Sequence, residues 1–201
     1  MATFFLVRHG MCDPVGHSIA GRMPGVHLNA EGRRQAEMLV ERFDGIRLDS
    51  IYTSPLERAR ETAAPLAQQR GLEPIVVNDM VELDFGEWTG ARIDELESDP
   101  RWKLFNSARS TARIPAGETM REAQQRAVAV LHAVVGRAPD SWNIVVSHGD
   151  IIRAVIMHFL DMPLDSVHHL EVSPASISEV VVYAGGWAVV RAVNVRGSIG
   201  G

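Results

Sequence analysis

The sequence predicts an α/β fold, a three-layer sandwich in which helices flank a mostly parallel central sheet. Short apolar runs alternate with segments of helical periodicity, and a two-strand pattern closes the chain. Alternation of this kind is typical of a sheet built from strand–helix–strand units. Ligands of such sheets bind at the carboxyl ends of the strands, so polar residues at those points are candidate functional residues.

The first elements follow in this order. Thr3–Val7 is a short apolar strand, and Ser50–Thr53 (SIYT) is the next one. Between them, Asn29 is expected to cap a helix that runs to about Phe43. Apolar side chains recur at helical spacing on one face of this helix, at Ala36, Leu39, Val40 and Phe43.

A second helix is predicted directly after the second strand. The sequence SPLE places Ser54 as N-cap, Pro55 at the first helical position and Glu57 three residues after the cap. This pattern is typical of a capping box. The helix is expected to end at about Arg70, before Gly71.

The remaining elements continue the alternation. Ile75–Val77 is a further strand, and an irregular, lid-like insertion at about 81–119 is expected to lie over one end of the sheet. A long amphipathic helix follows from Glu118 to about Ala138. Asn143–Val146 (NIVV) is predicted as a fully buried strand, and the next helix is predicted over Asp150–Phe159. The chain closes with a hairpin of Ile177–Tyr183 and Ala188–Val195 around Gly185–Gly186.

Composition narrows the class of protein. The chain has 201 residues, 46% of them hydrophobic and 22% charged, which suffices for one globular domain. A net charge of -5 argues against a general nucleic-acid or membrane surface. The lone Cys12 excludes an internal disulfide and a cysteine-based zinc site. With no signal-peptide pattern and no bilayer-length apolar stretch, we expect a cytoplasmic protein.

Four polar clusters stand just past predicted strand or turn ends. The sequence LVRHG carries Arg8 and His9, and YTSPLERAR carries Arg58 on its first helical turn. VELDFGEW carries Glu82, and NIVVSHGD carries His148 in a second His-Gly pair. Because the carboxyl ends of parallel strands meet at one edge, we expect these side chains to share a site.

Phosphoryl transfer explains this set of residue types best. Arginine forks match phosphate oxygens, a neutral imidazole can attack phosphorus, and a carboxylic acid can protonate the leaving oxygen. A second imidazole, if protonated, would stabilise the charge that develops on the phosphoryl oxygens. A metal site is a weaker alternative, because arginines rarely stand beside metal ligands. A serine hydrolase is also weaker, because the G-x-S-x-G pattern is absent.

The ordered motifs LVRHG, SPLERARETA, ELDFGEWTG, PAGET and VVSHGDIIRA resemble the histidine phosphatase superfamily, which has the phosphoglycerate-mutase-like fold. The resemblance covers nearly the whole chain and implies a single domain over residues 1–201. It implies that His9 is the nucleophile that becomes phosphohistidine and that Arg8 and Arg58 bind phosphate. It further implies that Glu82 is the proton donor and His148 the second pocket histidine. No metal or organic cofactor is implied.

The chain departs from the family pattern directly after the first motif. Val15 stands where family members commonly place an asparagine that touches phosphate. We expect Arg22 to supply the missing contact, with His17 next and Ser18 as a further candidate. The backbone N–H of Gly149 is expected to join the anion site at the start of its helix.

Two neighbouring residues are expected to have structural roles. Cys12 is interpreted as a small buried hydrophobic residue at the pocket rim, and Asp150 as a helix-start residue favoured by the helix dipole.

The expected function is a phosphatase acting on small phosphorylated metabolites. The insertion is short and lacks a paired-arginine stretch, and the chain closes with VRGSIGG, so an open site is expected to favour hydrolysis. A phosphoglycerate mutase and a catalytically quiet phosphate-binding module are the alternatives. The oligomeric state stays open, with a homodimer as one option.

Overall fold

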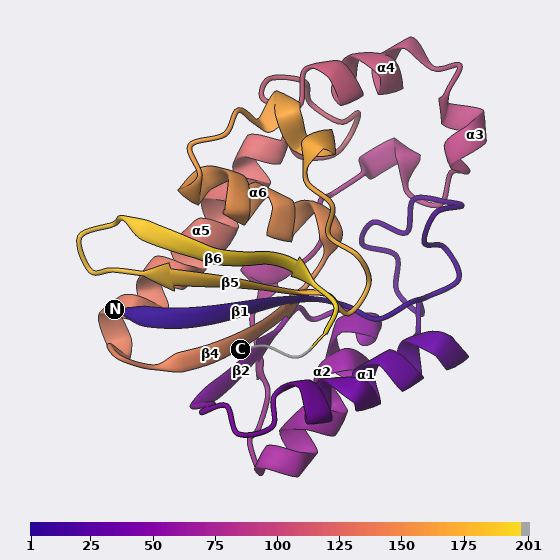
Figure 1. The fold of residues 1–201 in the computed structure, drawn as a ribbon. Coiled ribbons are helices and arrows are strands. Elements are labelled where there is room, and N and C mark those ends of the chain that lie inside the picture. The colour runs from indigo at the N-terminus through magenta and orange to yellow at the C-terminus, as the bar shows by residue number, and fades with distance from the viewer. Residues whose placement is uncertain (198–201) are drawn as a thin grey trace.

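A computed structural model describes residues 1–197, and its centre is a six-stranded sheet (Figure 1). The strand order is β3-β2-β4-β1-β5-β6. The first four strands in this order are parallel, whereas β5 is antiparallel to β1 and β6 is antiparallel to β5. The strands are β1 (Ala2–Arg8), β2 (Ser50–Thr53), β3 (Ile75–Val76), β4 (Trp142–Ser147), β5 (Ile177–Val182) and β6 (Ala188–Val195).

Helices cover both faces of the sheet, which confirms the predicted three-layer sandwich. Figure 1 shows α1 (Ala30–Arg42) and α2 (Glu57–Arg70) on one face, and α5 (Met120–Arg137) and α6 (Gly149–Phe159) on the other. Shorter helical pieces connect these elements. They are η1 (Asn78–Met80), η2 (Gly86–Trp88), α3 (Ile93–Leu96), α4 (Pro100–Ser107) and η3 (Leu164–His169).

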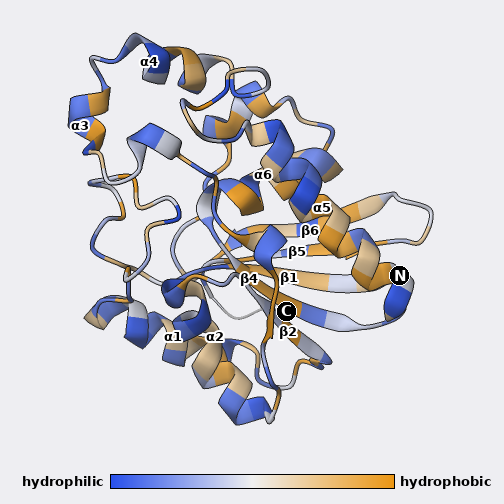
Figure 2. Cartoon of the chain, turned by 180° about the vertical axis from the view of Figure 1, so that it is seen from behind, coloured by the Kyte–Doolittle hydropathy of each residue, from blue (hydrophilic) through white to orange (hydrophobic). Residues whose placement is uncertain are grey.

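The alternation of side chains along β1 builds a core on each face of the sheet. Phe4 and Leu6 pack with apolar residues of α5 and α6, whereas Phe5 and Val7 pack with those of α1 and α2. All four side chains are almost fully buried, and each contributes about 1.5–3 kcal/mol of transfer free energy. Figure 2 shows the hydrophobic colour concentrated on the strands and the inward sides of the helices. The sheet is therefore packed on both faces, and the loops at its carboxyl edge extend from this core.

Local capping signals were predicted correctly at α1 but not at α2. The Asn29 side chain accepts a hydrogen bond from the backbone N–H of Gly32, as a helix N-cap does. The predicted capping box of Ser54 is wrong, because α2 begins at Glu57 and its N-cap residue, Leu56, makes no side-chain cap. Gly71 ends α2 in the left-handed conformation, as expected.

The segment at about 81–119 is held together by aromatic packing. Trp88 packs edge-on against Trp102 at 5.2 Å between ring centroids, and Phe105 lies 5.5 Å from Trp88. After this segment, Thr119 and Glu122 form a reciprocal capping box, so α5 begins slightly later than its predicted start. Within residues 1–197, no helix combines the length and apolar character needed to cross a membrane.

Candidate active site

The two His-Gly turns lie side by side because β1 and β4 are parallel neighbours. Arg8 is in register with Ser147, and the backbone N–H of His9 donates to the Ser147 carbonyl at 2.9 Å. This register brings the rings of His9 and His148 to 5.2 Å between centroids. Both histidines are buried, with exposures of 4% and 0%.

A close backbone approach explains the glycine after His9. A Cβ on Gly10 would lie 2.7 Å from the carbonyl oxygen of Gly32, at the start of α1, which is closer than real Cβ atoms come. The Gly10 N–H donates to the hydroxyl of Thr62 at 2.9 Å, and that hydroxyl donates to the Arg58 carbonyl at 2.6 Å. The β1 turn is thereby fastened to both α1 and α2.

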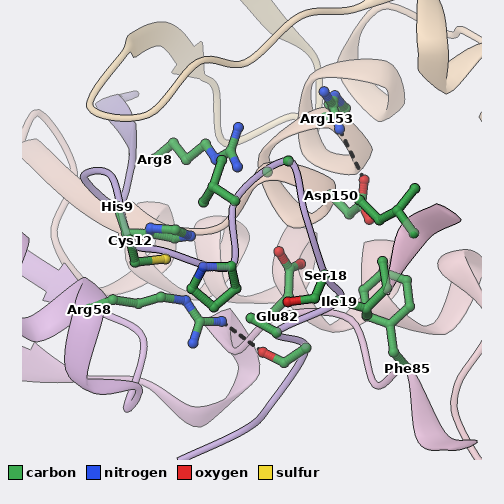
Figure 3. A pocket seen from close by; sticks show the side chains of 17 residues that line it. Arg8, His9, Cys12, Ser18, Ile19, Arg58, Glu82, Phe85, Asp150 and Arg153 are labelled. Atoms are coloured by element: carbon green, nitrogen blue, oxygen red, sulfur yellow. Dashed lines mark hydrogen bonds and ion pairs between the residues drawn. The ribbon is translucent and has the colours of Figure 1, made fainter. Parts of the chain in front are cut away.

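A cavity of about 230 Å³ opens at this edge of the sheet (Figure 3). Figure 3 shows Arg8, His9 and Arg58 along one side and Ile19 and Phe85 on the opposite side. His148 packs behind His9 and is not part of the lining. The sequence-predicted residues that line the cavity are Arg8, His9, Arg58, Glu82 and Gly149.

Both arginines present buried donors that lack partners among residues 1–197. Arg58 is 1% exposed and donates from Nη2 to the Gly21 carbonyl at 2.7 Å, but its Nε and Nη1 make no hydrogen bond. Arg8 donates from Nη1 to the Val172 carbonyl at 2.7 Å, and its Nε is likewise unpartnered. Buried donors without partners cost free energy, and an anion bound between the two guanidiniums would accept hydrogen bonds from them.

His9 is held in the form that a nucleophile requires. Its Nδ1–H donates to the Gly10 carbonyl at 2.7 Å, which leaves the Nε2 lone pair unprotonated. Burial, together with the positive charges of Arg58 and Arg8, lowers the pKa of His9 to about 3. The imidazole is therefore neutral throughout the physiological pH range.

Glu82 is suited to hold a proton near neutral pH. Burial and the negative charge of Asp150 raise the pKa of Glu82 to about 7. Its Oε1 accepts a hydrogen bond from the backbone N–H of Leu83 at 2.9 Å, which orients the carboxyl group. A carboxylic acid with this pKa can both donate and accept a proton near pH 7.

His148 differs from the protonated form that the chemistry was expected to use. Burial and the neighbouring His9 and Arg58 lower the pKa of His148, so the neutral imidazole is favoured in this structure. Its Nε2 hydrogen-bonds the Ser54 hydroxyl at 2.7 Å, and its Nδ1 is buried without a partner. Ser54, which the sequence assigned to helix capping, instead orients His148.

Asp150 and Arg153 belong to the cavity wall, although sequence reasoning assigned Asp150 only to the helix start. Asp150 stands in the first turn of α6 as expected, and its Oδ1 pairs with Arg153 Nη1 at 3.2 Å. Its Oδ2 lies 3.5 Å from Nη1 of the buried Arg109, whose guanidinium stacks on Phe105 at 4.0 Å. Arg153 was overlooked, and its spacing of three residues from Asp150 on a helix that begins at the site was the available signal.

The candidates for the missing asparagine contact lie in different places. Arg22 does not line the cavity, because its Nε donates to the Glu82 carbonyl at 2.9 Å and its Nη2 pairs with Glu118 at 2.7 Å. It supports the backbone that carries Glu82. His17 is exposed and outside the lining, whereas Ser18 and Val15 both line the cavity. Of the three candidates, Ser18 is the one placed to reach a bound molecule.

Two smaller observations complete the site. Cys12 is 1% exposed and also lines the cavity, so it is both a core residue and part of the wall. Within the part of the chain that the structure describes, no group of three or more His, Cys, Asp or Glu side chains could hold a metal ion.

Comparison with known proteins identifies the family of the chain. The family model described as the histidine phosphatase superfamily (branch 1) matches residues 4–195. A protein of Klebsiella pneumoniae named "Probable phosphoglycerate mutase GpmB" is 32% identical over 203 residues, covering 97% of this chain and 94% of its own length.

Solved structures share the whole fold. YhfR of Bacillus stearothermophilus superposes with a TM-score of 0.88 at 28% identity, covering 100% of this chain and 98% of its own. A phosphoserine phosphatase of Entamoeba histolytica, solved as the H9A mutant with phosphoserine, has a TM-score of 0.87 at 26% identity, covering 96% and 97%. From its sequence match and its fold, the chain belongs to the histidine phosphatase superfamily, branch 1.

Proposed function

We propose that the protein is a metal-independent phosphatase that hydrolyses small phosphomonoesters through a phosphohistidine intermediate. One observation carries this proposal: the unprotonated Nε2 of His9 shares a cavity with two arginines that hold unpartnered donors. The Glu82 carboxyl lines the same cavity with a pKa of about 7. Nucleophile, anion cradle and acid are the three parts that a two-step phosphoryl transfer needs.

In the first step, His9 Nε2 attacks the phosphorus atom and the bond to the ester oxygen breaks. The phosphoryl group is transferred to nitrogen, and the leaving oxygen takes the proton of the Glu82 carboxylic acid. Arg8, Arg58 and the Gly149 N–H bind the phosphoryl oxygens as charge develops on them. A bound phosphate dianion also opposes the depression of the His148 pKa, so His148 can add a donor.

In the second step, water replaces the alcohol. The Glu82 carboxylate accepts a proton from the water molecule as its oxygen attacks the phosphohistidine. The nitrogen–phosphorus bond breaks, inorganic phosphate leaves, and Glu82 is protonated again. His9 returns to its neutral form, so no cofactor is consumed.

Phosphoglycerate mutase activity is the second candidate, because the Klebsiella pneumoniae relative carries that name. Hydrolysis is favoured because Arg153, the cationic residue of the lining besides Arg8 and Arg58, is already paired with Asp150. A mutase must retain an anionic product until it is phosphorylated again, and this wall offers it little unpaired charge.

The test is hydrolysis of p-nitrophenyl phosphate by the purified protein in the presence of EDTA. We expect turnover that EDTA does not reduce, and a fall of at least about 1000-fold in kcat for His9→Ala. His169→Ala, which removes an exposed histidine of η3, is the matched control and keeps full activity. A radiolabelled phosphoenzyme, trapped under alkaline conditions, is expected in the parent protein and absent in His9→Ala.

Three results would overturn the proposal. They are activity that survives His9→Ala, activity that EDTA abolishes, and phosphate binding without turnover, as in a quiet binding module. Conversion of 3-phosphoglycerate to 2-phosphoglycerate without release of phosphate would establish the mutase instead.

A further inference from the structure

The wall of the cavity that faces away from His9 is mostly apolar. Ile19 and Phe85 lie on the opposite side from His9 and Arg58 (Figure 3). Ile93, from α3, extends this surface. Pro14 and Val15, from the loop after β1, also contribute apolar side chains to the lining. A leaving group bound beside the phosphoryl group therefore meets carbon atoms on several sides.

Several backbone groups of this wall are already hydrogen-bonded within the protein. The N–H of Ser18 donates to the Pro14 carbonyl at 2.9 Å, and the N–H of Ile19 donates to the Ala91 carbonyl at 2.9 Å. The Ile19 carbonyl accepts from Gly90 at 2.7 Å. With these groups occupied, a substrate hydroxyl has the Ser18 side chain as a partner on this loop, but a body with several hydroxyls cannot replace all of its hydrogen bonds to water there.

The charged residues of the wall are also paired with one another. Arg153 donates from Nε to the Leu170 carbonyl at 2.9 Å and from Nη1 to Asp150 at 3.2 Å. Asp150 in turn lies against Arg109. The phosphate end is different, because Arg8 and Arg58 have buried donors without partners. The cavity thus has one end with unpartnered buried donors for an anion, and one end where Arg153 is held by Asp150 and the Leu170 carbonyl.

We propose that the substrates are phosphomonoesters whose leaving group has an apolar alkyl or aryl body, rather than a polyol or a carboxylate. This inference rests on the proposed function and names the substrate class for it. An apolar body gains free energy by leaving water at Ile19, Phe85 and Ile93. A hydroxylated or carboxylated body loses hydrogen bonds to water, and this wall returns only part of them, through Ser18 and Arg153. The cavity of about 230 Å³ has room for a body of roughly the size of one aromatic ring beside the phosphate.

The test compares primary alkyl phosphates, so that the chemistry at the ester oxygen is similar throughout. The panel is benzyl phosphate, glycerol 3-phosphate, 3-phosphoglycerate and phosphoserine, each assayed for released phosphate. We expect kcat/KM for benzyl phosphate to exceed each of the others by about tenfold or more, within the range that apolar pockets achieve. A preference for glycerol 3-phosphate, 3-phosphoglycerate or phosphoserine would overturn the inference while leaving phosphatase function intact.

A pair of variants ties the preference to this wall. Ile93→Asn places an amide on the apolar surface, and we expect it to reduce the ratio of benzyl phosphate to glycerol 3-phosphate activity by about fivefold or more. Leu104→Asn, which alters an exposed leucine of α4 outside the cavity, is the control and keeps the parent ratio. An unchanged ratio in a folded Ile93→Asn variant would contradict the inference. Failure of the parent protein to hydrolyse any ester would overturn the proposed function and the inference together.

Discussion

The imidazole rings of His9 and His148 lie 5.2 Å apart and are inclined by 58°, although their residues are far apart in sequence. The parallel pairing of β1 with β4 fixes this relationship, since each histidine directly follows its strand. The neutral forms of both rings are favoured, and each has one nitrogen held by a neighbour, Gly10 for His9 and Ser54 for His148. A pair of this kind can take a phosphoryl group on one ring and support it with the other.

Glu82→Gln is expected to affect substrates according to their leaving group. A basic alkoxide needs a proton from Glu82, so kcat/KM for an alkyl phosphate should fall by about 100-fold or more. Nitrophenolate leaves without much protonation, so the loss on p-nitrophenyl phosphate should be about tenfold or less. The measurement is kcat/KM on both esters, and equal losses would contradict the role of Glu82 as proton donor.

The pH profile should report the ionisation of Glu82. Glu82 must enter the first step protonated and has a pKa of about 7, so kcat/KM for an alkyl phosphate should fall as pH rises through about 7. Asp150, Arg58 and Arg8 are the charges that act on this carboxyl. Asp150→Asn removes the negative charge that raises the pKa of Glu82. The substitution therefore lowers this pKa, and the alkaline limb of the kcat/KM profile moves to lower pH.

The control for this shift is Asp140→Asn, which neutralises an exposed carboxylate near the N-terminus. It should leave the profile where it is. If the alkaline limb of the profile stays in place in Asp150→Asn, or moves to higher pH, then the charge of Asp150 does not raise the pKa of Glu82.

Arg58→Lys should weaken phosphate binding while keeping the positive charge. A lysine ammonium cannot reproduce the planar fork that both bonds Gly21 and presents free donors to an anion. We expect kcat/KM to fall by about 100-fold and competitive inhibition by inorganic phosphate to weaken in parallel. Arg60→Lys, which changes an exposed arginine two residues further along α2, is the matched control. Unchanged inhibition by phosphate in Arg58→Lys would contradict the proposed role of the Arg58 guanidinium in binding phosphate.

Gly32→Ala is expected to destabilise the fold where α1 meets the turn after β1. Its Cβ would lie 2.0 Å from the backbone carbonyl oxygen of Met11, so the chain must shift. We expect the free energy of unfolding to fall by about 1–3 kcal/mol. Gly136→Ala in α5 has open space around its Cβ and should raise the free energy by about 0.5–1 kcal/mol. Urea unfolding of both variants provides the comparison.

Much of the fold was predictable because its signals are local. Apolar runs and helical periodicity identified the strands and the long helices, and the side chain of Asn29 capped its helix as expected. The ordered motifs placed Arg8, His9 and Arg58 at one cavity, because each stands at or just after the carboxyl end of a parallel strand. These conclusions needed only local patterns in the chain and the family resemblance that its ordered motifs carry.

Tertiary structure alone decided which partner each polar side chain found. Ser54 has the spacing of a helix cap, but its hydroxyl hydrogen-bonds His148. Arg22 pairs with Glu118 and donates to the Glu82 carbonyl instead of lining the cavity. Asp150 is part of the cavity wall, where Arg109, from a distant segment, pairs with it. The sequence by itself determined the elements and the residue types at the end of the cavity that carries Arg8, His9 and Arg58. Only the folded chain decided how the leaving-group end is lined, because burial and pairing across the fold depend on contacts that sequence spacing does not encode.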